Sequence, residues 1–139
     1  MAVTAFVDTD TLPTSNGGTV DLVSSGFGTV DAGVYFFNRA NTTNNPQADF
    51  AAGIAFYDGT NDSSVAFRAL DNLGASSTDR YSSTTDVYYD GALRYGVAAT
   101  TDGVRITKNS GTTGISRYVS GVSFGGLTNA ASGTLNLGS

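Results

Sequence analysis

Short runs of alternating apolar and polar residues, separated by clusters of Gly, Asn, Asp and Ser, extend along most of this chain. A period of two is typical of β-strands that bury one face. In the clearest run, 50–57, Ile54 and Phe56 alternate with Ala55 and Tyr57. Because no stretch has the 3.6-residue period of an amphipathic helix, the pattern predicts an all-β protein.

The alternation predicts ten strands. They are Val3–Val7, Thr19–Ser24, Ala32–Phe37, Phe50–Tyr57, Val65–Ala69, Asp86–Tyr89, Leu93–Ala98, Gly103–Thr107, Ile115–Phe124 and Gly133–Leu137. The run from Val34 to Phe37 is apolar on both faces, so we expect a central strand covered on both sides. Two polar stretches, Asn38–Gln47 and Asp71–Thr85, are predicted as long loops.

Turn residues separate the predicted strands. Asp-Gly pairs at 58–59, 90–91 and 102–103 favour tight turns, and the pair at 90–91 predicts a hairpin. Ten strands with two long connections predict a jelly-roll-like antiparallel β-sandwich over residues 19–139, with an immunoglobulin-type sandwich as the alternative. Residues 1–18 are predicted to form an extended N-terminal arm.

The composition limits the chemistry. The chain has twelve acidic residues, all Asp, and it lacks His and Cys, so catalytic triads, thiolate nucleophiles and the usual zinc sites are excluded. We therefore expect no enzyme activity, no catalytic residue, no metal and no cofactor. The formal charge is −5 and the seven basic residues are scattered, so nucleic-acid binding is not expected. Without a signal peptide or a long apolar span, we expect a soluble protein made in the cytoplasm, with no membrane partner.

Five motifs along the chain are Val20–Gly28 (VDLVSSGFG), Gly33–Phe37 (GVYFF), Gly53–Gly59 (GIAFYDG), Asp102–Ile106 (DGVRI) and the stretch from Tyr118 to Gly126. Together they resemble motifs of virion structural proteins of tailed bacteriophages. The likeness spans about residues 19–126. It departs from the family where Thr29–Ala32 replaces a common Pro-Lys pair, and where Tyr35 and Phe36 stand at positions often held by Trp.

The resemblance implies a jelly-roll module of the virion, usually homotrimeric. Because no trimerising stalk is visible, we expect a capsid decoration (cement) protein on the capsid surface, which binds the major capsid protein. The apolar residues of the arm and the scattered arginines are the predicted partner-binding residues. They are Val3, Phe6, Val7, Leu12, Arg39, Arg68, Arg80 and Arg117.

The alternative function is a tail-fibre or receptor-binding module that recognises host surface carbohydrate. Its candidate site is Tyr88, Tyr89, Asp90 and Arg94, which combines aromatic faces, a carboxylate and a guanidinium. The simpler interpretation is that one tyrosine is in the core, because alternation sends adjacent residues to opposite faces. Calcium at Asp58–Asp62 is likewise less favoured than a turn in which Asp caps its own backbone.

Overall fold

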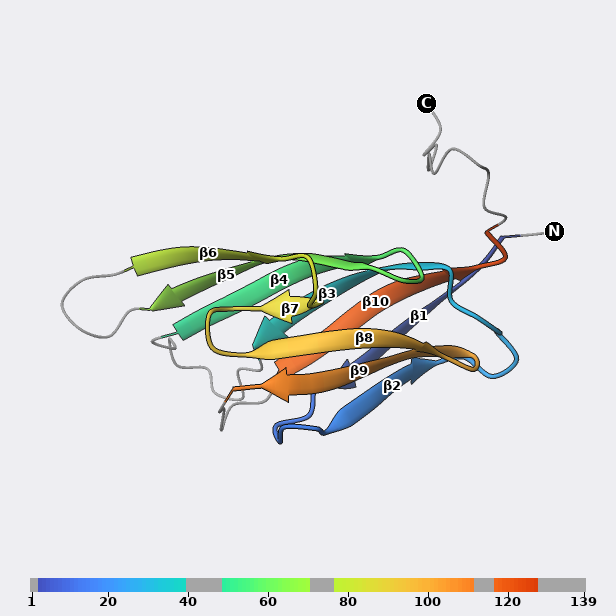
Figure 1. The fold of residues 1–139 in the computed structure, drawn as a ribbon, viewed down its shortest axis with the longest axis horizontal. Coiled ribbons are helices and arrows are strands. Elements are labelled where there is room, and N and C mark those ends of the chain that lie inside the picture. Colours follow the sequence, from blue (N-terminus) through green and yellow to red (C-terminus); the bar gives the residue numbers. More distant parts are fainter. Residues whose placement is uncertain (1–2, 40–48, 71–76, 112–116, 128–139) are drawn as a thin grey trace, which may run out of the picture.

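Two antiparallel β-sheets face each other in the computed structural model of this protein, which describes residues 3–39, 49–70, 77–111 and 117–127 (Figure 1). The strands are β1 (Thr4–Thr11), β2 (Thr19–Val23), β3 (Ala32–Arg39), β4 (Asp49–Tyr57), β5 (Asp62–Leu70), β6 (Ser77–Ser83), β7 (Tyr88–Tyr89), β8 (Arg94–Thr100), β9 (Gly103–Ser110) and β10 (Arg117–Gly125). Over these described ranges, no helix is long and apolar enough to span a membrane. The prediction of an all-β antiparallel sandwich is confirmed.

The strand order is β1-β10-β3-β4-β5-β6 in one sheet and β2-β9-β8-β7 in the other. The first and last strands, β1 and β10, pair in the six-stranded sheet, and the next strands inward along the chain, β2 and β9, pair in the four-stranded sheet. This nesting is the rolled pattern of a jelly roll. The remaining strands pair with their sequence neighbours, as β3-β4-β5-β6 and β7-β8-β9. The fold therefore combines a jelly-roll frame with two meanders.

The expected N-terminal arm is not confirmed, because β1 is an edge strand of the sandwich itself. All eight of its residues pair with β10, and the backbone amide of Leu12 donates to the carbonyl of Arg117 at 2.7 Å. Phe6 packs edge-to-face on Phe27 with ring centroids 4.6 Å apart, and Leu12 is buried. Phe6 and Leu12 are removed from water by packing within their own chain, so the segment does not need a partner to bury them.

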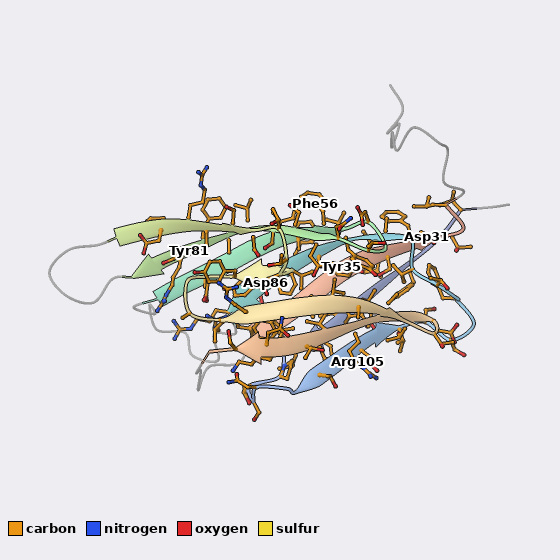
Figure 2. All side chains as sticks on the ribbon, viewed as in Figure 1. Asp31, Tyr35, Phe56, Tyr81, Asp86 and Arg105 are labelled. Atoms are coloured by element: carbon orange, nitrogen blue, oxygen red, sulfur yellow. The ribbon has the colours of Figure 1, made fainter. Side chains whose placement is uncertain are left out.

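Aromatic side chains fill much of the space between the sheets. Tyr35, Phe37, Tyr88 and Tyr95 are all fully buried, and Figure 2 shows Tyr35 between the two layers. The Tyr35 hydroxyl is 3.0 Å from the hydroxyl of Ser123, so its polar end has a hydrogen-bond partner.

Three sequence predictions differ from the structure, and two others fall wholly or largely outside the residues that it describes. β6 lies in the predicted loop Asp71–Thr85, because an edge strand needs no apolar alternation to pair on one side. The predicted strand Asp86–Tyr89 is reduced to two residues. β3 is covered on one side only, since Phe36 is 55% exposed. Gly133–Leu137 and most of Asn38–Gln47 lie outside the described residues.

The tight turns predicted at the three Asp-Gly pairs are confirmed. Gly59 and Gly91 have φ of 88° and 84°, and the hairpin predicted at 90–91 joins β7 to β8. At 102–103 the positive φ falls on Asp102 itself, at 66°. Its carboxylate accepts a hydrogen bond from the Gly28 amide at 2.8 Å, so this turn is tied to a distant loop.

Candidate functional site

A hydroxyl-lined hollow opens where the chain crosses from one sheet to the other. β6 is an edge of the six-stranded sheet and β7 an edge of the four-stranded sheet, so no further strand of either sheet covers this side. The hollow has a volume of about 310 Å³. Its lining residues are Ser82, Ser83, Thr84, Thr85, Tyr89 and Arg94. Four of these six residues are serine or threonine, whose hydroxyls both donate and accept hydrogen bonds, and those of Ser83 and Thr85 already donate to Asp86.

The aromatic and cationic parts of the hollow come from one hairpin. Tyr89 and Arg94 are paired across β7 and β8, so their side chains lie on the same face. The Arg94 guanidinium carbon lies 4.5 Å from the centre of the Tyr89 ring, a cation–π contact. Tyr81 of β6 packs edge-on to the same ring at 5.6 Å. The Arg94 side chain remains 48% exposed, so part of the guanidinium faces solvent.

Asp86, which is labelled in Figure 2, holds Ser83 and Arg94 in place by hydrogen bonds. Its side chain is only 5% exposed, and its Oδ2 accepts a hydrogen bond from the Ser83 hydroxyl at 2.9 Å and from the Arg94 guanidinium at 3.4 Å. The Asn109 amide lies at 3.5 Å from Oδ1. Because these donors come from β6, β8 and β9, one carboxylate ties together the elements around the hollow.

A second polar cluster lies inside the sandwich. The Asp90 carboxylate pairs with the Arg117 guanidinium at 2.7 Å and accepts a hydrogen bond from the Tyr88 hydroxyl at 3.0 Å. Its other oxygen accepts from the backbone amides of Leu93 at 2.8 Å and Ala92 at 3.1 Å, which closes the hairpin turn. The side chains of Arg117 and Asp90 are 8% and 0% exposed. This cluster is therefore part of the core.

Burial and hydrogen bonding shift the pKa of Asp90 in opposite directions. Burial raises the pKa of Asp90, but the hydrogen bond from Arg117 and the amides of Leu93 and Ala92 outweigh it, so the pKa lies below its ordinary value. Burial raises the pKa of Tyr88. Within the described part of the chain, Nε and Nη1 of Arg117 have no hydrogen-bond partner, so Asp90 carries most of the compensation for this buried cation.

The structure separates the four predicted glycan-binding residues into two pairs. Tyr89 and Arg94 line the hollow, whereas Tyr88 and Asp90 are buried in the core cluster. The simpler interpretation, with one tyrosine in the core, is thus confirmed for Tyr88. Alternation along the two-residue strand β7 accounts for the separation.

The predicted partner-binding residues do not gather on one surface. Val3, Val7 and Arg80 are exposed, but Val7 is on β1 and Arg80 on β6, at opposite edges of the sheet. The other five are partly or fully buried: Phe6, Leu12, Arg39, Arg68 and Arg117.

The acidic turn considered for calcium caps its own backbone. Oδ1 of Asp58 accepts hydrogen bonds from the amides of Asn61 at 2.7 Å and Thr60 at 3.0 Å, and these bonds lower the pKa of Asp58. Asp62 is partly buried, and burial raises its pKa. Among the described residues, no three acidic side chains gather to hold a metal ion. Asp86 and Asp90 are each ion-paired with an arginine.

Sequence reasoning missed four of the six residues that line the hollow. The run Ser82–Thr85 was interpreted as loop, although four consecutive hydroxyl residues before the tyrosine pair were a visible signal. The role of Asp86 carried no local signal, because its partners are distant in the chain.

Comparison with known proteins yields little. No family model matches the chain, and no curated protein matches it. A tailspike of Acinetobacter baumannii bacteriophage Fri1, described as a capsular polysaccharide depolymerase, matches with a TM-score of 0.35 and 10% identity, over 88% of this chain and 17% of the tailspike. The tailspike of Acinetobacter baumannii phage AM24 matches with a TM-score of 0.36 and 12% identity, over 93% of this chain and 27% of the tailspike. The chain thus spans about a quarter or less of each tailspike, and neither likeness assigns a fold family or a function to it.

Proposed function

We propose that this chain is a carbohydrate-binding module of a phage virion, which recognises a host surface glycan through the hollow between β6 and the β7–β8 hairpin. The observation that carries the proposal is the composition of that hollow: four hydroxyl side chains, the Tyr89 ring and the Arg94 guanidinium around about 310 Å³. The sequence resemblance to virion proteins supplies the biological setting.

The geometry suits a sugar better than an apolar ligand. Sugars present dense hydroxyls, which pair with the serine and threonine hydroxyls, and flat C–H faces, which lie against aromatic rings. Arg94 is held by Asp86 and Tyr89, so little side-chain entropy is lost when its exposed N–H groups bind a ligand. A hydrogen bond to a charged group contributes about 1.5–3 kcal/mol. One shallow site of this kind binds weakly, and repetition on a virion raises the avidity.

The test is binding of the labelled protein to an array of bacterial surface glycans. Wild type is expected to bind a subset of glycans, and Tyr89→Ala to lose at least about tenfold in affinity. Val23→Ala is the control, because Val23 is 47% exposed on β2 of the other sheet and lies outside the hollow. An array with no bound glycan, or equal binding by wild type and Tyr89→Ala, would refute the proposal.

Capsid decoration by a homotrimer is the second candidate. It is favoured by an apolar sheet face that the sandwich leaves in water, with Phe36 55% and Phe56 53% exposed, because proteins that assemble bury such faces. The test is co-sedimentation with capsid shells that lack the protein. Binding at a fixed ratio per capsid subunit is expected, and recovery of the protein only in the supernatant would exclude this candidate.

A further inference from the structure

The face of the six-stranded sheet that points away from the four-stranded sheet is apolar across three of its four inner strands, β3, β4 and β5. Figure 2 shows Phe56 on this side, opposite in direction to the buried Tyr35. Pairing places Val34 beside Phe56, and Phe36 beside Ile54. We define the outer apolar face as Val34, Phe36, Ile54, Phe56, Val65 and Phe67.

The three phenylalanines of this face are exposed, and Val34, Ile54 and Val65 between them are half-buried. Phe36, Phe56 and Phe67 are 55%, 53% and 45% exposed. The opposite sheet has the usual polar exterior, where Asp21 and Arg105 form an ion pair at 2.7 Å. Since antiparallel sheets normally carry polar residues on the side that faces water, the contrast within one sandwich marks the outer apolar face as a surface that another molecule covers.

The exposed area is large enough for a protein interface. An aromatic side chain buries about 150–250 Å², so three half-exposed phenylalanines leave roughly 300 Å² in water. Val7 is 77% and Tyr118 39% exposed on β1 and β10, and they extend the area to about 500 Å². Two such faces in contact bury about 1,000 Å², which is the least that a specific interface needs.

The charge pattern favours a second copy of the chain as the occupant. The protein has a formal charge of −5, yet Arg80 of β6 is the one charged side chain that the described strands present on this face. Two copies therefore approach through this face with no carboxylate on either side. A cationic partner finds no carboxylate to pair with there.

We infer that the outer apolar face is a self-association surface, on which the six-stranded sheet of one copy packs against that of a second copy. Sheets pack face to face about 10 Å apart, and twisted sheets align at about −30°. The same patch then serves both copies, which gives a closed symmetric contact. The outer apolar face adjoins the hollow, since Val65 pairs with Ser82, but the two surfaces share no residue, so a virion module can assemble through one and bind through the other.

The experiment is the mass of the purified chain in solution, measured by light scattering after size exclusion over a concentration series. The test variant carries Phe36→Thr and Phe56→Thr, because threonine keeps strand propensity while removing the apolar area. The control is Val23→Thr, since Val23 is 47% exposed on β2 of the other sheet. A thermal melt confirms that each variant is folded, and Phe36→Leu with Phe56→Leu is the second variant if the threonine pair unfolds.

Wild type and Val23→Thr are expected above the mass of one chain, with a mass of two chains for a symmetric pair. The threonine pair is expected to be monomeric, with self-association weakened by roughly a hundredfold or more. The leucine pair is expected to associate like wild type, because it keeps the apolar surface. A wild type that is monomeric throughout the series, or a threonine pair that keeps the wild-type mass, would overturn the inference. So would a leucine pair that is folded and monomeric.

Discussion

Replacing Asp90 by asparagine removes the charge that compensates the buried Arg117 while keeping the size of the side chain. The asparagine carbonyl oxygen still accepts the amides of Leu93 and Ala92, so the turn is retained. Its NH₂ group, however, now faces the Arg117 guanidinium, where Oδ2 of Asp90 lies 2.7 Å away in the wild type. Donor then meets donor, and a buried cation is left without its counter-charge.

The expected loss is large because both partners are buried. Breaking a buried ion pair by removing one partner costs about 3–5 kcal/mol. The upper part of this range applies here, because Nε and Nη1 of Arg117 have no other acceptor among the described residues. A domain of this size has a free energy of unfolding of about 5–15 kcal/mol, so Asp90→Asn is expected to lower the melting temperature by roughly 10–15 °C.

The assay is urea unfolding at several pH values, with Asp90→Asn/Arg117→Met as the compensated variant. The double variant is expected to recover most of the loss, because it removes the orphaned cation. The lowered pKa of Asp90 means that the ion pair stabilises the wild type above the unfolded-state pKa of about 3.9 and that this stability is lost as pH falls through the folded-state value. The free energies of unfolding of wild type and Asp90→Asn should therefore become equal in acid. The reasoning would be refuted if Asp90→Asn lowered the free energy of unfolding by less than about 1 kcal/mol at pH 7. It would also be refuted if the difference between the two proteins did not change with pH.

Three further outcomes are expected. Asp62→Asn should raise the melting temperature at pH 7, because burial raises the pKa of Asp62 and the charged carboxylate therefore destabilises the folded state. This gain in melting temperature should vanish as pH falls below about 4, where the carboxylate is protonated in both states. A gain that persists in that acid range would contradict this prediction. Gly121→Ala should cost about 1–3 kcal/mol in urea unfolding, since its Cβ would collide with the Tyr35 ring; an equal cost in a Tyr35→Leu background would argue against that collision. Asp86→Asn should weaken binding of an array-selected glycan about tenfold in calorimetric titration by releasing Arg94, and unchanged affinity would remove Asp86 as a positioning residue.

The strands with one buried face were predictable from sequence, and those whose environment is set by partners were not. The alternation of 50–57 gave the correct faces of β4, and the Asp-Gly pair at 90–91 gave the correct hairpin. β6 was missed because a polar edge strand has no signal of its own. The apolar run at Val34–Phe37 was interpreted as doubly covered, since one sequence does not show whether the second cover comes from the same chain.

The candidate site was half predictable for a similar reason. Tyr89 and Arg94 are close in sequence and meet across a hairpin that a two-residue turn specifies. Asp86 holds Arg94 and also contacts Asn109, which is on β9 and is separated from it by 23 residues. Such long-range partners follow from the strand order, which local pattern does not determine. Arg117 and Asp90 likewise read as surface charges in sequence and proved to be a core pair.

The central claim is that the hollow beside Tyr89 and Arg94 binds carbohydrate. Its most direct test is an NMR titration of the ¹⁵N-labelled protein with the glycan that binds best on the array, following every backbone amide. The account predicts that the largest shifts fall on Ser82–Thr85, Tyr89 and Arg94, and that they disappear in Tyr89→Ala. Shifts confined to other strands, or no saturable shift at millimolar glycan, would contradict it.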